Sequence, residues 1–251
     1  MSIEVRAPDR VRVASQHGLG DWHDGEWMVA RGCTKVSPGC VNCTAAWSLI
    51  DTPVAKATDR GADWTGVVEP IERQITVTPT RWDRPLRLFV GASTDFWHEG
   101  LSDEFRARVW AQVHRYKQHT FAFLTKRSRE MCNWFERVDP EVPDNVWLGV
   151  SVENDDYRWR LDDLLMIDAR VRFAQCEPLL DRVHLEPYLK PYPNGQRGLD
   201  WVAAGPEWGV ANARPCDVRW MRQLRDDCAK HGIPFFTKHL LDGREHRELP
   251  T

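Results

Sequence analysis

Three of the seven cysteines of the chain lie within eleven residues, at Cys33, Cys40 and Cys43. Their spacing is Cys-x6-Cys-x2-Cys, and because Pro38 and Gly39 interrupt any helix between them, the segment is predicted to be a loop. A loop that brings thiolates together is typical of a site for a soft metal. The chemistry of the chain therefore depends first on which metal this loop would hold.

The spacing alone leaves several interpretations of the loop open. A disulfide is disfavoured, because the number of cysteines is odd and the rest of the chain has an intracellular character. A structural zinc ion fits the Cys-x2-Cys half-site but needs a fourth ligand, for which His17 and His23 are candidates. An iron–sulfur cluster is commonly held by four cysteines, and three cysteines on a four-iron cluster would leave one iron open for a substrate or cofactor. Incidental thiols without a metal are the remaining interpretation.

The composition is that of an ordinary globular protein. The chain has 251 residues, of which 42% are hydrophobic and 28% charged, enough for one large domain or two small ones. A formal net charge of −3 gives no overall basic signature for nucleic-acid binding, although a local patch is compatible with it. The sequence shows no signal-peptide pattern and no run of about 18 apolar residues that would span a membrane. We therefore expect a cytoplasmic protein without a membrane partner.

Strand-like and helix-like segments alternate from residue 86 onward. Short apolar runs are predicted as strands, and the segments between them carry apolar residues at helical spacing. The predicted strands are 27–30, 86–93, 120–125, 146–152, 171–176, 201–204 and 234–237. This alternation is typical of βαβ units in an α/β fold with a parallel sheet. About seven parallel strands favour a (β/α) barrel, full or partial and TIM-like, over a doubly wound open sheet.

The chain is predicted to form a single barrel domain over residues 26–251, after an N-terminal arm at 1–25. An irregular insertion is expected around 51–84, where the alternation at 74–78 indicates either an excursion or a small hairpin. Residues 179–189 are predicted to be partly helical. The glycine-rich dinucleotide fingerprint after the first strand and the Walker motif are both absent from the sequence, so the common nucleotide-binding signatures do not apply.

Polar or ionisable residues follow each predicted strand, at the edge where parallel α/β folds carry their sites. One such residue is usually solvated, but a complete set on the edge that also holds the cysteines indicates a functional site. The candidate residues are Ser93, Thr94, Asp95, His98, Lys126, Ser151, Glu153, Asn154, Cys176, Glu177, Glu207 and Lys238. Some have an alternative structural interpretation: Lys126 can pair with Glu153, His98 can cap a helix, and Cys176 can be a buried thiol.

Taken with these strand ends, the cysteine loop resembles a family of radical-SAM-like proteins of bacteriophages and bacteria, most of them uncharacterised. That family carries Gly-Cys-Thr-x-x-Ser-x-Gly-Cys-x-x-Cys, which is present here from Gly32 to Cys43. Further similar segments extend over most of the chain, at 93–99, 124–127, 145–154, 176–180 and 234–238. The sequence departs from the family at Thr44, where tyrosine is usual, and at 205–209. The first cysteine gap is also longer than the usual Cys-x3-Cys of radical SAM enzymes.

The resemblance implies a cofactor and a distribution of roles. Cys33, Cys40 and Cys43 would hold a [4Fe–4S] cluster, whose open iron would bind S-adenosylmethionine. The cofactor-binding residues would be Ser93, Thr94 and Asp95 toward the methionine moiety, Ser151, Glu153 and Asn154 toward the ribose, and Glu207. The catalytic candidates would be His98, Lys126, Cys176, Glu177 and Lys238, with the two lysines facing a carboxylate or an anionic substrate. A flavodoxin- or ferredoxin-like protein would reduce the cluster.

The reaction implied by this family is the reductive cleavage of S-adenosylmethionine to a 5′-deoxyadenosyl radical that modifies a substrate. The occurrence of the family in phages makes a nucleotide or nucleic acid the first substrate class to consider. Two other functions remain open: a zinc-stabilised nucleic-acid-binding module, and a non-catalytic partner of another protein. The first of these predicts a basic face, for which Arg106, Arg108, Arg115 and Lys117 are candidates, although an ordinary solvated helix has the same pattern.

Overall fold

The structure is a computed structural model that describes residues 22–59, 61–193, 195–208, 210–241 and 244–250. The side chains of residues 238–245 lie outside the described part. Within the described part, none of the helices combines the length and the apolar character that a membrane crossing requires.

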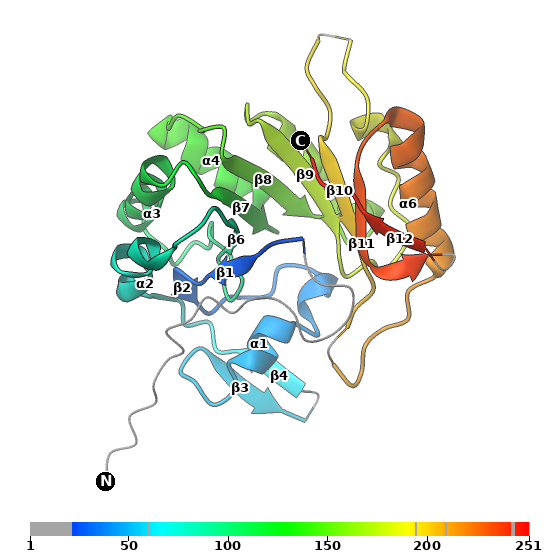
Figure 1. Ribbon diagram of the computed structural model, residues 1–251. Helices are drawn as coiled ribbons and strands as arrows, with labels where there is room; N and C mark the ends of the chain where they lie inside the picture. The colour runs from blue at the N-terminus through cyan, green and yellow to red at the C-terminus, as the bar shows by residue number, and fades with distance from the viewer. Residues whose placement is uncertain (1–21, 60, 194, 209, 242–243, 251) are drawn as a thin grey trace.

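An eight-stranded sheet curls into a half-barrel, in the order β1-β6-β7-β8-β9-β10-β11-β12 (Figure 1). Neighbouring strands from β1 to β11 are parallel, and β12 runs antiparallel to β11. In the part that the structure describes, no pairing joins β1 to β12, so the barrel is partial. The strands are β1 (Gly25–Trp27), β6 (Arg87–Val90), β7 (Thr120–Thr125), β8 (Val146–Ser151), β9 (Val171–Cys176), β10 (Trp201–Ala204), β11 (Phe235–Leu241) and β12 (Arg244–Arg247). Seven parallel strands in a partial barrel confirm the predicted fold class.

Helices connect most of the parallel strands. Figure 1 shows α3 and α4 beside β6, β7 and β8, and α6 beside β10 to β12. As the sequence predicts, Ser102 caps α3, because its hydroxyl accepts a hydrogen bond of 3.2 Å from the Phe105 backbone N–H. The α-helices are α1 (Thr44–Ser48), α2 (Glu72–Thr76), α3 (Asp103–Arg115), α4 (Ser128–Val138), α5 (Trp159–Leu165) and α6 (Val218–His231). Short 3₁₀ turns are η1 (Pro38–Cys40), η2 (Thr78–Arg81), η3 (Asp155–Tyr157) and η4 (Glu186–Tyr188).

The segment between β1 and β6 forms a subdomain below the sheet that carries α1 and two small sheets (Figure 1). One pairs β2 (Ala30–Arg31) with β5 (Glu69–Pro70), and the other is a hairpin of β3 (Ala55–Thr58) and β4 (Gly61–Trp64). The predicted insertion thus contains a hairpin, but not at 74–78. That segment falls in the end of α2 and the start of η2, and α2 buries Ile75.

Three further boundaries differ from the sequence-based prediction. The first strand ends at Trp27, because the Ile71 N–H donates to the Val29 carbonyl and draws the chain into the β2–β5 pair. The barrel also begins before residue 26, since Trp22 is 3% exposed and packs inside it and β1 starts at Gly25, whereas residues 1–21 of the predicted arm lie outside the described residues. Between β9 and β10 the predicted partial helix is reduced to η4.

The two faces of the sheet have different cores. The outer face packs Phe121, Phe123 and their neighbours against the helices. The inner face holds an aromatic cluster of Trp22, Trp147, Phe173, Trp201 and Phe236. A Cβ added at Gly149 would lie 2.3 Å from the Phe173 ring, so this glycine lets the ring cross β8. The lumen is therefore filled by aromatic side chains at one end, which leaves the other end, at the carboxyl ends of the strands, to form a site.

A buried histidine beneath the sheet should make stability depend on pH. His119 is 1% exposed, its Nδ1 accepts from the Leu86 N–H at 3.1 Å, and its Nε2 has no hydrogen-bond partner among the described residues. Desolvation by burial lowers the pKa of His119. Below about pH 6.5 the unfolded chain therefore binds more protons than the folded chain, and the stabilisation present above that pH is lost as the pH falls through the lowered pKa.

We expect the free energy of unfolding, measured with urea between pH 7.5 and pH 5, to decrease more steeply with falling pH in wild type than in His119→Phe. Phenylalanine keeps the contact with Trp82 and Phe121 but cannot be protonated. Identical slopes in the two proteins would show that His119 does not contribute.

Candidate functional site

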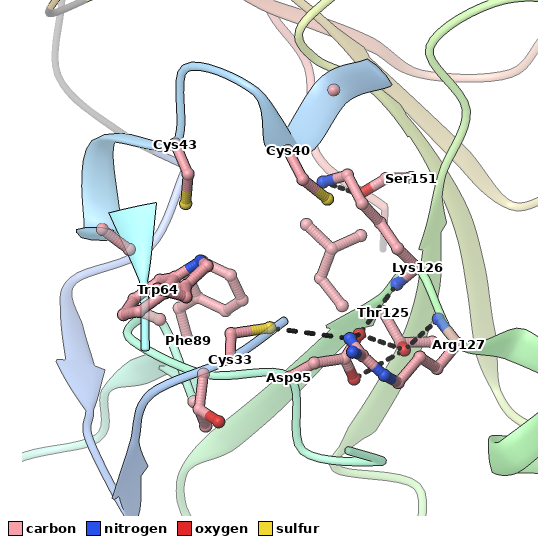
Figure 2. A pocket seen from close by; sticks show the side chains of 16 residues that line it. Cys33, Cys40, Cys43, Trp64, Phe89, Asp95, Thr125, Lys126, Arg127 and Ser151 are labelled. Carbon is pink, nitrogen blue, oxygen red and sulfur yellow. Dashed lines mark hydrogen bonds and ion pairs between the residues drawn. The ribbon is translucent and has the colours of Figure 1, made fainter. Parts of the chain in front are cut away.

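The three cysteine thiols of the loop line one cavity of about 140 Å³ at the carboxyl ends of the strands. Figure 2 shows the sulfur atoms of Cys33, Cys40 and Cys43 facing this space, with Arg127 beside Cys33 and Lys126 reaching Ser151 beside Cys40. Trp64 of the hairpin and Phe89 of β6 close another side. The cavity is called the thiol cavity below. The cysteine loop therefore places three thiols around one cavity.

Two glycines allow the cysteine loop to lie close to its neighbours. Gly32 has φ +91°, and a Cβ there would lie 2.1 Å from the Val67 carbonyl oxygen. At Gly39 a Cβ would lie 2.4 Å from the carboxylate of Glu153, which also accepts a hydrogen bond from the Ser37 hydroxyl. The loop is thus held against the end of β8 by the residues that surround Cys40.

The thiols surround a space rather than a point. Among the described residues, no three Cys, His, Asp or Glu side chains lie close enough together to hold one metal ion. A tetrahedral zinc with Zn–S bonds of 2.3 Å would need sulfur atoms about 3.8 Å apart. Of the two histidines that could complete a zinc site, His17 lies outside the described residues. His23 does not line the thiol cavity, but a second space beside it that is described below. Three thiols around an open cavity fit a polynuclear iron–sulfur group better than a single ion.

Arg127, the second residue after β7, joins the cysteine loop to the segment that follows β6. Its guanidinium donates to the sulfur of Cys33 at 3.5 Å, to both oxygens of Thr34 and to the carboxylates of Asp95 and Glu99. The Arg127 side chain is 4% exposed. Desolvation by burial would lower the pKa of Arg127, but Asp95, Cys33 and Glu99 outweigh it and raise that pKa. A permanent positive charge therefore contacts the first cysteine.

The charges around Cys33 favour its neutral thiol. Burial raises the pKa of Cys33 to about 11, and the Asp95 carboxylate acts in the same direction, while Arg127 opposes both. Asp95 is itself fixed by hydrogen bonds from the Thr125 hydroxyl at 2.7 Å and from the backbone N–H groups of Lys126 and Trp97 at 3.1 Å. Since metal binding needs thiolate, loading this cavity would release protons.

Lys126 faces the thiol cavity from the end of β7 and donates to the Ser151 hydroxyl at 3.3 Å. Desolvation by burial lowers the pKa of Lys126, but Glu153 and the thiols of Cys40 and Cys43 outweigh it, so that the net shift is upward. Glu153 is fully buried and also pairs with Arg160 of α5, whose Nη1 donates at 2.8 Å. The expected pairing of Lys126 with Glu153 is thus electrostatic, and it includes a second cation.

A second, larger chamber of about 410 Å³ adjoins the thiol cavity. The two share part of their walls, including Cys43, Phe89 and Lys126. The other walls come from the carboxyl ends of β9 and β10, with Gln175, Glu177, Glu207 and Trp208, and from Ser93 after β6. Of the three cysteines, Cys43 lines this space, which is called the substrate chamber below for the role that is proposed for it in later sections.

The loop after β10 is tied to the cysteine loop through Glu207. Its carboxylate accepts a hydrogen bond from the Asn42 side-chain amide at 2.8 Å. It also accepts from the backbone N–H of Arg214 at 2.9 Å and from the Arg214 guanidinium. Arg214 also donates to the Pro38 carbonyl at 2.9 Å. Desolvation by burial would raise the pKa of Glu207, but the bonds from Arg214 and Asn42 lower it overall. This loop therefore fixes the backbone on both sides of Cys40.

Most of the predicted site residues line one of the two adjoining spaces. Thr94, Asp95, Lys126 and Ser151 line the thiol cavity, and Ser93, Glu177 and Glu207 line the substrate chamber. Two residues support the loop without lining either space: Glu153, described above, and His98. The Nδ1 atom of His98 accepts a hydrogen bond from the Gly100 N–H. In the neutral imidazole Nε2 therefore carries the proton, and it donates to the Thr34 hydroxyl at 3.0 Å.

Two predicted residues lie away from the site, and a third has its side chain outside the described residues. Cys176 is fully buried in the core that faces the helices and lines neither space, because alternate residues of β9 point to opposite faces of the sheet. Asn154 caps η3 by accepting from the Asp156 N–H at 3.1 Å. The side chain of Lys238 lies outside the described residues, although its backbone belongs to β11.

Several residues of the site were not selected by the sequence-based prediction. Arg127 and Gln175 stand at predicted strand ends beside selected residues, and the strand-end rule includes them without assigning them a role. Asn42 lies inside the Cys-x2-Cys spacing. Trp64, in the hairpin, and Arg214, in a long loop, carry no pattern that indicates their contribution, because only the tertiary fold brings them to the site.

Two variants of spore photoproduct lyase are among the solved structures that share this fold. One is 8% identical, with a TM-score of 0.52, and covers 94% of this chain and 81% of that chain. The other, solved with bound AdoMet and dinucleoside spore photoproduct, is 9% identical, with a TM-score of 0.50 and the same coverage. At these identities the likeness concerns the fold. None of the curated proteins matches the chain. The family model described as "Protein of unknown function (DUF5131)" matches residues 20–247, and the chain belongs to that family.

Proposed function

We propose that this protein is a radical S-adenosylmethionine-type iron–sulfur enzyme that modifies a nucleotide or nucleic-acid substrate. The observation that carries the proposal is the convergence of three thiols on one cavity at the carboxyl edge of a partial (β/α) barrel. The likeness of the fold to spore photoproduct lyase, one structure of which holds AdoMet and a dinucleoside, supports the same chemistry.

In this proposal Cys33, Cys40 and Cys43 hold a [4Fe–4S] cluster in the thiol cavity, and a flavodoxin- or ferredoxin-like protein supplies the electron. Together with S-adenosylmethionine, such a cluster would supply radical chemistry: one electron would break the S–C5′ bond, giving methionine and a 5′-deoxyadenosyl radical for hydrogen abstraction. In this proposal the residues of the chain bind and orient the cofactor and the substrate. Lys126 offers an ammonium group toward an anionic carboxylate, and the hydroxyls of Ser151 and Thr94 line the same wall.

The other residues of the site keep this arrangement rigid and dry. Arg127 and Asp95 fix the position of the loop at Cys33, and Glu207 with Arg214 fixes it on both sides of Cys40. Trp64 and Phe89 cover the cavity with apolar surface and exclude water from a reactive intermediate.

The test is the iron, sulfide and zinc content after anaerobic reconstitution, together with the formation of 5′-deoxyadenosine from S-adenosylmethionine under reductant. We expect about four irons per chain in wild type, and loss of both iron and deoxyadenosine in Cys33→Ala, Cys40→Ala and Cys43→Ala. Cys216→Ala is the matched control, because Cys216 lines neither space at the site. Stoichiometric zinc without iron and without deoxyadenosine would overturn the proposal and favour a zinc-stabilised binding module.

A further inference from the structure

The substrate chamber contains a buried polar atom that lacks a partner. Gln175 stands at the end of β9, is 9% exposed and lines the chamber. Its amide nitrogen donates to the Glu177 carboxylate at 3.2 Å, whereas its Oε1 has no hydrogen-bond partner among the described residues. A carboxylate can only accept hydrogen bonds, so the nitrogen must be the end that faces Glu177. The unsatisfied atom is therefore an acceptor, and a buried acceptor without a donor is costly.

The same wall offers a flat aromatic face. Trp208 follows β10, lines the chamber and is 42% exposed. Its indole Nε1 donates to the Glu177 carboxylate at 2.7 Å, which fixes that edge of the ring. The same carboxylate accepts the hydrogen bond from the Gln175 amide nitrogen. A planar ligand that stacks on Trp208 would present its edge toward Gln175 and Glu177.

The charge of the chamber selects against phosphate. Its lining includes the carboxylates of Glu26, Glu177 and Glu207, the last of which is paired with Arg214, and the ammonium of Lys126, which is shared with the thiol cavity. Acceptors that gather at one wall favour a ligand with N–H donors at its edge, and the excess of negative charge disfavours an anion. A volume of about 410 Å³ is in the range of small-molecule sites.

We propose that the substrate chamber binds an uncharged, N–H-bearing nucleobase, stacked on Trp208 and donating to Gln175 Oε1, while any attached phosphate stays outside. This deepens the proposed function and rests on it, because the chamber shares Cys43 and Lys126 with the thiol cavity and so places the base beside the radical source. Gln175 is the residue that distinguishes a base with a donor edge from one without.

The experiment measures binding of the four 2′-deoxynucleosides to the reconstituted protein by titration calorimetry, with the ring N-methylated and exocyclic N,N-dimethylated derivatives as donor-free counterparts. We expect at least one nucleoside to bind, and its methylated form to bind about tenfold more weakly, from the loss of one hydrogen bond to a buried acceptor. Gln175→Leu should weaken the parent nucleoside about tenfold and leave the methylated form unchanged.

A second variant, Trp208→Ala, keeps the test valid if Gln175→Leu folds poorly. The Trp208 side chain is partly exposed, so its removal should disturb folding less. We expect it to weaken both the parent and the methylated nucleoside by about 5- to 150-fold, as stacking does not depend on the donor. The control is Trp159→Ala, an equally exposed tryptophan on α5 that lines neither space, which should bind as wild type does.

Two failures are distinguishable. If deoxyadenosine is formed from S-adenosylmethionine but no nucleoside binds, or the parent and methylated forms bind equally, the nucleobase inference is wrong and the proposed function stands. If nucleosides bind with the expected selectivity but no iron-dependent deoxyadenosine is formed, the radical function fails, and the chamber remains a nucleobase site.

Discussion

Glu153→Leu is expected to lower the free energy of unfolding by about 3–5 kcal/mol, because it removes the anion from a buried pair and leaves cations without compensation. Glu153 is fully buried, and its partner Arg160 is 1% exposed. Arg160 Nη1 donates to Glu153 at 2.8 Å, and Lys126 is held charged largely by the same carboxylate. Leucine fills a similar volume but accepts no hydrogen bond, so both cations would face an apolar side chain.

The loss should extend to the cysteine loop. Glu153 accepts from the Ser37 hydroxyl and lies against Gly39, so its removal frees the turn that carries Cys40. We therefore expect less iron per chain after reconstitution of Glu153→Leu, even at temperatures where the protein is folded. Urea unfolding followed by circular dichroism measures the first effect, and iron analysis the second.

Two variants sharpen this prediction. Glu153→Gln keeps an acceptor of the same shape without the charge and should fall between wild type and Glu153→Leu in stability. Glu72→Gln removes a carboxylate from an ion pair with Arg108 that is exposed on both sides, and surface pairs contribute little. If Glu153→Leu were as stable as Glu72→Gln, the carboxylate would not be the group that compensates the cations.

The barrel could be predicted from the sequence because its strands are short and buried on both faces. The strands β7, β8, β9 and β10 read as almost continuous apolar runs and occur within one or two residues of their predicted positions. Their ends then follow from the topology of parallel sheets, which gathers residues such as Asp95, Lys126 and Ser151 at one edge. Strand prediction and one rule of topology were sufficient for this part of the site.

The remaining residues could not be predicted, since their roles depend on long-range packing. The alternation at 74–78 resembles a strand, but Ile75 is buried against the sheet, so the tertiary contact favours helix α2. Cys176 follows the strand-end rule in position, but the pleat of β9 directs it to the helices, while Gln175 faces the chamber. Arg160 and Arg214 stabilise the cysteine loop from a helix and a loop that lie far away in the sequence.

Arg127→Met is expected to lower the free energy of unfolding by about 3–5 kcal/mol and to reduce the iron retained after reconstitution. The Arg127 guanidinium is 4% exposed and satisfies groups from two segments: Thr34 beside the first cysteine, and Asp95 and Glu99 after β6. Methionine has a similar length and apolar stem but no donor. The buried Asp95 carboxylate would then lose its cation, and the Thr34 oxygens their donor.

The loss of iron has an electrostatic cause as well as a structural one. An iron–sulfur cluster held by thiolates is anionic, and Arg127 donates to the sulfur of Cys33 at 3.5 Å. Arg127→Lys restores one positive charge but not the forked geometry, because an ammonium cannot bridge Thr34, Asp95 and Glu99 at once. We therefore expect Arg127→Lys to recover iron content more fully than stability.

Arg108→Met is the matched control for Arg127→Met, since Arg108 forms an exposed ion pair with Glu72 and lines neither space. Its stability and iron content should equal those of wild type. If Arg127→Met retained full iron content while losing stability, Arg127 would serve the fold alone. If both Arg127 variants lost iron equally, the forked hydrogen bonds rather than the charge would hold Cys33 in place. These outcomes separate the role of Arg127 as a bridge between strands from its role as the cation at the first cysteine.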